Sequence, residues 1–338
     1  MTTNQPKVTF GFVNCNRLFY LKSCVESLLY CTEDYKNKEL IIIDNASVEP
    51  GTEEYLLEKE EQGFKIIRQQ TRDPANEFAK ALNIIAREST GDFVCPLQSD
   101  MQFLLRGEWL KQYVEFYQKN INVIGCILLD AQRGVTNTAH EPYGRLKDQE
   151  DDLFLFDIKR NPIAGAGDMM YSRAILDMIY PWSEKNESHE GGPDSETKML
   201  NKAKALMEKN ELQLHCVVPI IPPAAAIYTD ARGTNARVRK NKRYGDYWPP
   251  KEDFMYYKVH EYKDATQQYK AIKTLFSIET IAEPIGWSAP IDSSGSWKKN
   301  PLRPETAEPS DYTVLYDEAP AEEHSIASDE YLSDWLES

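Results

Sequence analysis

The stretch FVCPLQSDMQF, residues Phe93–Phe103, joins a short apolar run to a polar end. The run has the length and composition of a buried strand, and Asp100 follows just past its expected end. Gln98 lies two positions earlier, where a second acid would complete an acidic pair. The stretch therefore predicts a buried strand that brings a single carboxylate to the edge of a sheet.

Similar strand patterns alternate with amphipathic helices over about the first hundred residues. Strands are expected at 7–13, 39–44 and 64–68, and helices at 17–31, 53–63 and 77–90. This alternation predicts an α/β fold with a mostly parallel sheet covered by helices on both faces. Ligands in such sheets bind outside the carboxyl ends of the strands. Residues 14–17, 44–47 and 98–100 follow three strand ends and are expected to share one crevice.

The second half of the chain is less regular. It predicts a helix at 107–120, a strand at 121–129, and a glycine-containing loop or strand followed by a short helix within 162–182. A further helix over 191–210 is expected to begin at Pro193 or Asp194, and a strand follows within 214–223.

Charge and cysteine content narrow the class of protein. The net charge is −15, but residues 305–338 hold eleven acids and no Lys or Arg, which leaves −4 for residues 1–304. This profile does not indicate broad nucleic-acid binding, and the acidic tail is predicted to be largely disordered. None of the six cysteines forms a CxxC pair, so buried free thiols are expected. With no signal-peptide pattern and no apolar run of about 18 residues, a cytoplasmic protein without a membrane span is predicted.

The loop after the first expected strand, FVNCNR, limits which ligands can bind. It lacks the glycine-rich turn of a dinucleotide site, and the chain has no P-loop, so NAD binding is not expected. A nucleotide diphosphate would need a divalent cation or side-chain cations to neutralise it. Asp44 ends a strand, where an acid commonly binds a ribose hydroxyl or a base edge; the alternative role is to cap a turn.

Several segments, taken in order, resemble the motifs of family 2 glycosyltransferases with a GT-A fold. VTFGFVNCNR resembles the first strand and its nucleotide-contacting loop, and ELIIIDNAS resembles the second strand with its uridine-binding acid, Asp44. NEFAKALNIIAREST-GDFVCPLQSDM is similar to the helix and DxD segment, with Gln98 and Asp100 in the places of the two acids. AGAGDMMYSRAIL resembles the acceptor-side glycine segment, and GGPDSETKML the helix start that carries the catalytic base. The resemblance covers roughly residues 7–235.

The resemblance implies an inverting glycosyltransferase that moves a sugar from a nucleotide diphosphate donor, UDP-linked by default, to a glycan or other hydroxyl acceptor. Asp194 is then the general base, with Glu196 as an alternative base and a plain helix cap as the alternative role of Asp194. Asp100 and Asp230 are the implied ligands of Mn²⁺ or Mg²⁺. The implied donor-binding residues are Val13, Asn14, Asn16, Arg17, Asp44, Asn45, Lys80, Asn83, Gln98, Ser99, Arg232 and Arg237.

Three residues are candidates for contact with the acceptor, each with a second interpretation. Asp168 contacts the acceptor or satisfies a turn, Trp182 stacks on a sugar ring or packs in the core, and His189 contacts the acceptor or lies in a surface loop. The predicted organisation is a nucleotide-sugar-binding half at 1–105, an acceptor-binding half at 106–250, an aromatic and basic extension at 251–300 and the acidic tail at 301–338.

The sequence also departs from the family pattern. Gln98 offers only a neutral oxygen, Pro193 replaces the Glu that usually precedes the base, and Asp230 is the nearest substitute for a missing histidine. If neither acid binds metal, the basic run from Arg232 to Arg243 neutralises the diphosphate, unless it is simply a solvated loop. Two other functions stay open: a sugar transferase that modifies a nucleic acid, and a catalytically degenerate nucleotide-sugar-binding protein. A nucleotidyltransferase lacks support, because it needs a glycine-rich first loop. The end of the tail, DEYLSDWLES, is expected to dock on a protein partner or on a basic groove of the protein itself, or only to solubilise the chain.

Overall fold

The computed structural model describes residues 5–73, 75–129, 150–151, 154–156, 168–185, 193–219, 223–226 and 259–262. Several predicted features lie outside these residues: Asp230, Arg232, Arg237, His189, the basic run and the acidic tail.

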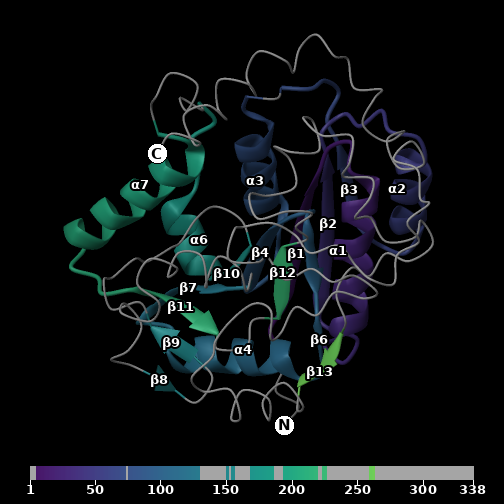
Figure 1. Cartoon of the computed structure of the whole chain (residues 1–338). Helices are drawn as coiled ribbons and strands as arrows, with labels where there is room; N and C mark the ends of the chain where they lie inside the picture. Colours follow the sequence, from purple (N-terminus) through teal and green to yellow (C-terminus); the bar gives the residue numbers. More distant parts are fainter. Residues whose placement is uncertain are drawn as a thin grey trace, which may run out of the picture.

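One sheet forms the centre of the described structure, and it contains nine strands in the order β3-β2-β1-β4-β10-β7-β11-β9-β8 (Figure 1). The first four in that order, β3, β2, β1 and β4, run parallel to one another, as the alternation of strands and helices predicts. β10 then runs antiparallel to both of its neighbours, and β11 returns parallel to β7. The strands are β1 Val8–Asn14, β2 Lys38–Asp44, β3 Lys65–Arg68, β4 Phe93–Gln98, β7 Ile124–Leu128, β8 Glu150–Asp151, β9 Phe154–Phe156, β10 Met169–Ser172 and β11 His215–Pro219.

Six described helices cover the two faces of this sheet, which confirms the predicted α/β architecture. They are α1 Leu18–Cys31, α2 Thr52–Glu61, α3 Glu77–Glu88, α4 Trp109–Lys119, α6 Arg173–Ile179 and α7 Ser195–Lys209. Alternate residues of each strand point to opposite faces, so the sheet supports two separate cores. One core holds the apolar faces of α1, α2 and α4, and the other holds those of α3, α6 and α7.

Short strands outside the main sheet fasten the second half of the chain to the first. β5 Met101–Phe103 pairs with β12 Ala224–Ala226, and β6 Leu105–Arg106 pairs with β13 His260–Glu261. Phe103, in the strand that directly follows the DxD-like segment, stacks on Trp109 with ring centroids 5.9 Å apart. The backbone just beyond Asp100 is therefore fixed by strand pairing and aromatic packing on both sides.

The carboxyl ends of the four parallel strands lie in register at one edge of the sheet. Asn14 pairs with Asp44, Asp44 pairs with Arg68, and Val13 pairs with Gln98. We call this the carboxyl edge; it carries the three segments that the sequence predicts to converge.

Gly11, in the middle of β1, allows α3 to pack closely on the sheet. A Cβ atom on Gly11 would lie 2.4 Å from Cγ2 of the fully buried Ile85 in α3. We expect Gly11→Ala to lower the free energy of unfolding by about 1–3 kcal/mol, because the core has no room for the added methyl group. Urea unfolding measures the change. Combining it with Ile85→Ala should recover part of the loss, and equal effects of Gly11→Ala in both backgrounds would contradict the proposed clash.

Candidate functional site

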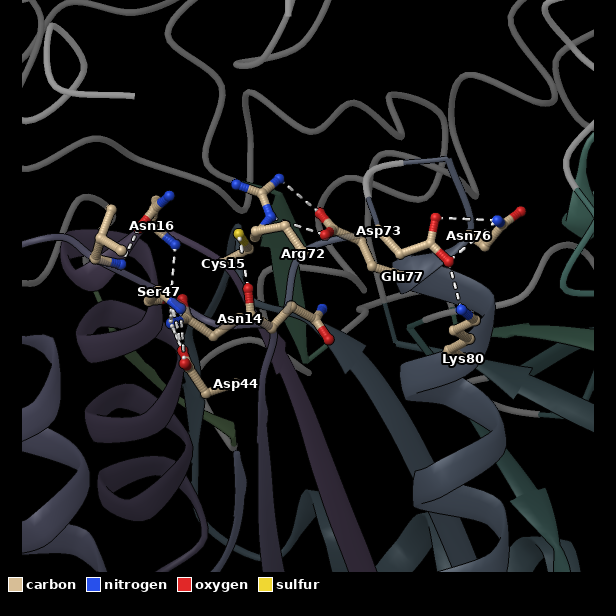
Figure 2. A network of polar contacts seen from close by, with 12 residues as sticks. Asn14, Cys15, Asn16, Asp44, Ser47, Arg72, Asp73, Asn76, Glu77 and Lys80 are labelled. Carbon is tan, nitrogen blue, oxygen red and sulfur yellow. Dashed lines mark hydrogen bonds and ion pairs between the residues drawn. The ribbon is translucent and has the colours of Figure 1, made fainter. Parts of the chain in front are cut away.

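Asp44 is the centre of a hydrogen-bonded corner at the ends of β1 and β2. Its Oδ1 accepts from Asn14 Nδ2 at 2.8 Å and from Ser47 Oγ at 2.6 Å, and its Oδ2 accepts from the Ser47 backbone N–H at 2.9 Å (Figure 2). Asp44 is 5% exposed and Asn14 is 1% exposed. The Asn14 amide oxygen is buried and has no hydrogen-bond partner among the described residues. Asp44 thus caps its own turn, and Asn14 keeps one acceptor unused.

Asn16 joins the loop after β1 to the loop after β2. It has a positive φ of 48°, and its Oδ1 accepts from the backbone N–H groups of Val48 at 2.7 Å and Glu49 at 3.1 Å. Glu49 in turn accepts from the backbone N–H of Leu18 at 2.8 Å, and its burial raises the pKa of this carboxyl group. Asn45 completes the contact, since its N–H donates to the Asn14 carbonyl oxygen at 2.9 Å. The two loops therefore form one rigid unit with a defined surface.

Arg17 connects this unit to the DxD-like segment after β4. Its Nη1 lies 3.5 Å from Asp100 Oδ2, and the two side chains are 24% and 16% exposed. Ser99, between Gln98 and Asp100, is buried. The structure thus brings Asp44, Arg17 and Asp100 to one edge from three separate segments, as the sequence predicts.

Asp168 lies beside the same segment. Its Oδ1 accepts from the backbone N–H of Gln98 at 2.9 Å, its own N–H donates to the Pro96 carbonyl at 2.7 Å, and its carbonyl accepts from Leu129 at 2.9 Å. It is buried and has a φ of 64°, a conformation that a short polar side chain tolerates. These contacts match the turn-satisfying alternative; contact with an acceptor stays a prediction.

A second group of charged residues follows β3, and only Lys80 of this group was predicted to be a site residue. Arg72 donates to both carboxylate oxygens of Glu77, at 2.9 and 3.0 Å, and Asp73 pairs with Lys80 and Asn76 (Figure 2). Burial pushes the pKa of Arg72 down, but the hydrogen bonds and charge of Glu77 outweigh this and raise the pKa. The available signal was the charge pattern of TRDPANEFAK after the end of a third parallel strand.

Cys15 lies among these charges without the character of a reactive thiol. Its Sγ donates to the Asn45 carbonyl at 3.4 Å. Burial, followed by the negative charge of Glu77, raises the pKa of the Cys15 thiol to about 12. The other five cysteines are buried, and all six are free thiols.

Asn83, predicted to contact the donor, and Trp182, predicted to contact the acceptor, are hydrogen-bonded to each other. Asn83 Oδ1 accepts from the Trp182 backbone N–H at 2.8 Å, and Asn83 Nδ2 donates to the Trp182 carbonyl at 2.9 Å and to Glu184 at 3.1 Å. The Trp182 side chain is 1% exposed and packs edge-to-face on Tyr171 at 6.3 Å. These contacts match the packing alternative for Trp182. Ligand contacts by either residue stay predictions.

Asp194 is the N-cap of α7, at the position where the sequence predicts the helix to begin. Its Oδ1 accepts from the Thr197 backbone N–H at 2.6 Å, so Asp194 caps the helix; its role as a general base stays a prediction. The side chain is half-buried, and α7 begins on the same upper side of the view as α3 in Figure 1. Capping uses one carboxylate oxygen and leaves the second for other chemistry.

No group of three or more His, Cys, Asp or Glu side chains suited to a metal lies within the described ranges. Of the predicted ligands within these ranges, Asp100 would supply a hard carboxylate and Gln98 a neutral amide oxygen. This set fits Mg²⁺ or Mn²⁺ bound in the manner of many nucleotide sites, where one or two protein carboxylates share the ion with substrate phosphates.

The carboxyl edge therefore belongs to an α/β protein, a class in which ligands bind outside the carboxyl ends of the parallel strands. The chain belongs to glycosyl transferase family 2, whose family model matches residues 11–179, half of the chain. This confirms the family predicted from the sequence, and with it the prediction of a glycosyltransferase at the level of the family.

Solved structures similar to the chain include two forms of TarS from S. aureus and a mannosyltransferase. TarS 1-349 is 18% identical over 58% of this chain and 55% of that chain, with a TM-score of 0.44. TarS 1-349 in complex with UDP-GlcNAc is 17% identical over 62% and 55%, with a TM-score of 0.43. Mannosyltransferase PcManGT from Pyrobaculum calidifontis, in complex with GDP-Man and Mn²⁺, is 16% identical over 72% and 63%, with a TM-score of 0.46. The chain spans less than two thirds of the length of each.

A comparison with curated proteins finds no match. Among the described helices, none has both the length and the apolar character needed to cross a lipid bilayer.

Proposed function

We propose that the protein is an inverting glycosyltransferase that moves a sugar from a nucleotide diphosphate donor, UDP-linked by default, to an acceptor hydroxyl. The observation that carries the proposal is the register of Asn14, Asp44 and Gln98 at one edge of the sheet. It brings the Asp44 corner and the Arg17–Asp100 pair to the place where α/β sheets bind nucleotides.

The nucleoside is expected to bind on the rigid unit formed by the loops after β1 and β2. Because Asp44 already accepts three hydrogen bonds, its main contribution is to shape this surface. Asn14 and the backbone of Val13 and Asn45 are proposed to line this surface, and the unused Asn14 oxygen is an acceptor for a ligand donor that reaches it. Arg72 and Glu77 extend the polar surface beside Cys15.

The diphosphate is expected to lie toward Arg17 and Asp100. A guanidinium binds phosphate oxygens in a paired geometry, so Arg17 is suited to this charge. Asp100, with Asp230 as a second candidate, would hold a divalent cation, which when bound adds positive charge beside the leaving diphosphate. Arg232 and Arg237 are proposed to contribute further positive charge, and Lys80 is proposed to contact the donor.

Asp194 is proposed to be the general base. Its carboxylate takes the proton from the acceptor hydroxyl while that oxygen bonds to the anomeric carbon and the bond to the diphosphate breaks. A single displacement of this kind inverts the anomeric centre. The contact of Oδ1 with Thr197 fixes the orientation of the carboxylate, so Oδ2 is the oxygen that receives the proton. Asp168, Trp182 and His189 remain the proposed acceptor-side residues.

The proposal is tested by incubating the full chain with a panel of nucleotide sugars and Mn²⁺ and measuring released nucleotide. We expect release from one donor, and calorimetry with UDP should show saturable binding. Release without any bound sugar product would indicate water as the acceptor. If neither UDP nor any other nucleoside diphosphate binds, the donor site is absent, and the proposed transferase function is wrong.

A further inference from the structure

An ion pair within the described residues joins the β1 loop to the DxD-like segment. In it Arg17 lies beside Asp100, the carboxylate proposed to bind the cation. At 3.5 Å the pair is a loose ion pair, longer than the 2.7–2.9 Å of a strong charge-assisted hydrogen bond. The Arg17 guanidinium also makes a cation–π contact, since it lies 5.9 Å from the centre of the Tyr20 ring. The guanidinium is thus kept beside Asp100 without being locked onto it.

Resting on the proposed function, we propose that Arg17 is a resident counter-ion that competes with the divalent cation for Asp100. A positive guanidinium and a positive metal ion repel each other, so a cation that reaches Asp100 first has to displace Arg17. The diphosphate of a donor gives the displaced guanidinium a new partner with two oxygens in the right geometry.

This competition makes cation binding at Asp100 depend on whether a nucleotide is already bound. In the absence of nucleotide, Arg17 weakens cation binding at Asp100. Once a diphosphate engages Arg17, the guanidinium no longer competes for Asp100, and the cation and the nucleotide favour each other's binding reciprocally. The single acid of the segment makes this control effective, because Gln98 supplies no second charge that could hold the cation against Arg17.

The local structure supports this counter-ion role for the side chain at position 17 and not for other positive side chains at the carboxyl edge. Arg17 is the N-cap residue of α1, so its backbone position is fixed by the loop unit that Asn16 and Glu49 hold together. Arg72 is a second arginine at the carboxyl edge, but its guanidinium is paired through two hydrogen bonds with Glu77. Arg72 is therefore a matched control with the same charge and a different carboxylate.

The test measures Mn²⁺ binding to the full chain without nucleotide, by the loss of the free-ion paramagnetic resonance signal. We expect Arg17→Met to bind Mn²⁺ about two- to fivefold more tightly than the unmodified protein, which corresponds to the strength of a partly exposed ion pair. Arg17→Lys should remain close to the unmodified protein, because an ammonium group also pairs with Asp100. Arg72→Met should leave Mn²⁺ affinity unchanged, and Asp100→Asn should weaken it strongly.

A second readout separates competition from a folding defect. With EDTA present and no metal, Arg17→Met should bind UDP several-fold more weakly, because it has lost the donors for the diphosphate. Tighter Mn²⁺ binding together with weaker UDP binding supports the proposal, whereas a general structural defect weakens both. Unchanged or weaker Mn²⁺ binding in Arg17→Met overturns it, as does an equal gain in Arg72→Met or no detectable Mn²⁺ binding to any of these proteins. Loss of UDP binding in the unmodified protein would instead overturn the proposed function.

Discussion

Replacing Asp194 by Asn is expected to lower kcat by about 10²- to 10⁴-fold, the usual contribution of a positioned general base. Nucleotide binding should change little, because Asp194 lies at the start of α7 and the proposed nucleoside surface lies at the ends of β1 and β2. The substitution is well suited to the question, since Asn is as good an N-cap as Asp and retains an oxygen for the Thr197 N–H. Single-turnover kinetics with a saturating donor measure the effect.

Glu196 provides the matched comparison, because it lies in the first turn of the same helix. Glu196→Gln should retain most of the activity of the unmodified enzyme. A severe loss in Glu196→Gln combined with an active Asp194→Asn would assign the base to Glu196, and activity in both variants would remove the base from this helix altogether. Thermal unfolding of each variant checks that α7 is intact.

Asp44→Ala is expected to damage both stability and nucleotide binding. The substitution leaves three donors without their acceptor, two of them on Ser47 and one on the nearly inaccessible Asn14. We expect the free energy of unfolding to fall by about 2–4 kcal/mol, the range for a broken buried polar network, and UDP affinity to fall more than about tenfold. Urea unfolding and calorimetry measure the two effects.

Asp92 serves as the control for Asp44. It also accepts a backbone hydrogen bond, from Lys7 at 2.8 Å, but this contact is exposed and lies at the amino end of the sheet. Asp92→Ala should cost less than about 1 kcal/mol and leave UDP binding unchanged. If Asp44→Ala binds UDP as tightly as Asp92→Ala does, the Asp44 corner is not part of the nucleotide site.

The sequence predicted the parallel half of the sheet because that half is built from local signals. Each strand there is an apolar run followed by an amphipathic helix, and parallel strands connected by helices end at the same edge. The convergence of Asp44 with the Arg17–Asp100 pair follows from that rule alone. The start of α7 at Asp194 was also predictable, since an N-cap depends on a few adjacent residues.

The remaining features depend on contacts between distant segments, which periodicity does not reveal. Nothing local in Met169–Ser172 shows that this strand pairs antiparallel with both β4 and β7. The Asn83 side-chain amide hydrogen-bonds to the backbone of Trp182, 99 residues away. The match of Asn83 to a ligand-binding position of the family gave no indication of this contact. The Arg72–Glu77 pair follows a fourth strand end, at Arg68, which was not among the three strand ends predicted to converge.

The four residues of β10 also have a consequence for engineering the protein. Tyr171 and Ser172 pair with β4, while Met169 and Met170 pair with β7, so one short strand joins the two regions of the sheet. The preceding Asp168 adds hydrogen bonds to Pro96, Gln98 and Leu129, which belong to both regions. A chimaera that imports a different second half must therefore retain 168–172 from this chain, or the transplanted part will lose its alignment with the strand that ends at Gln98.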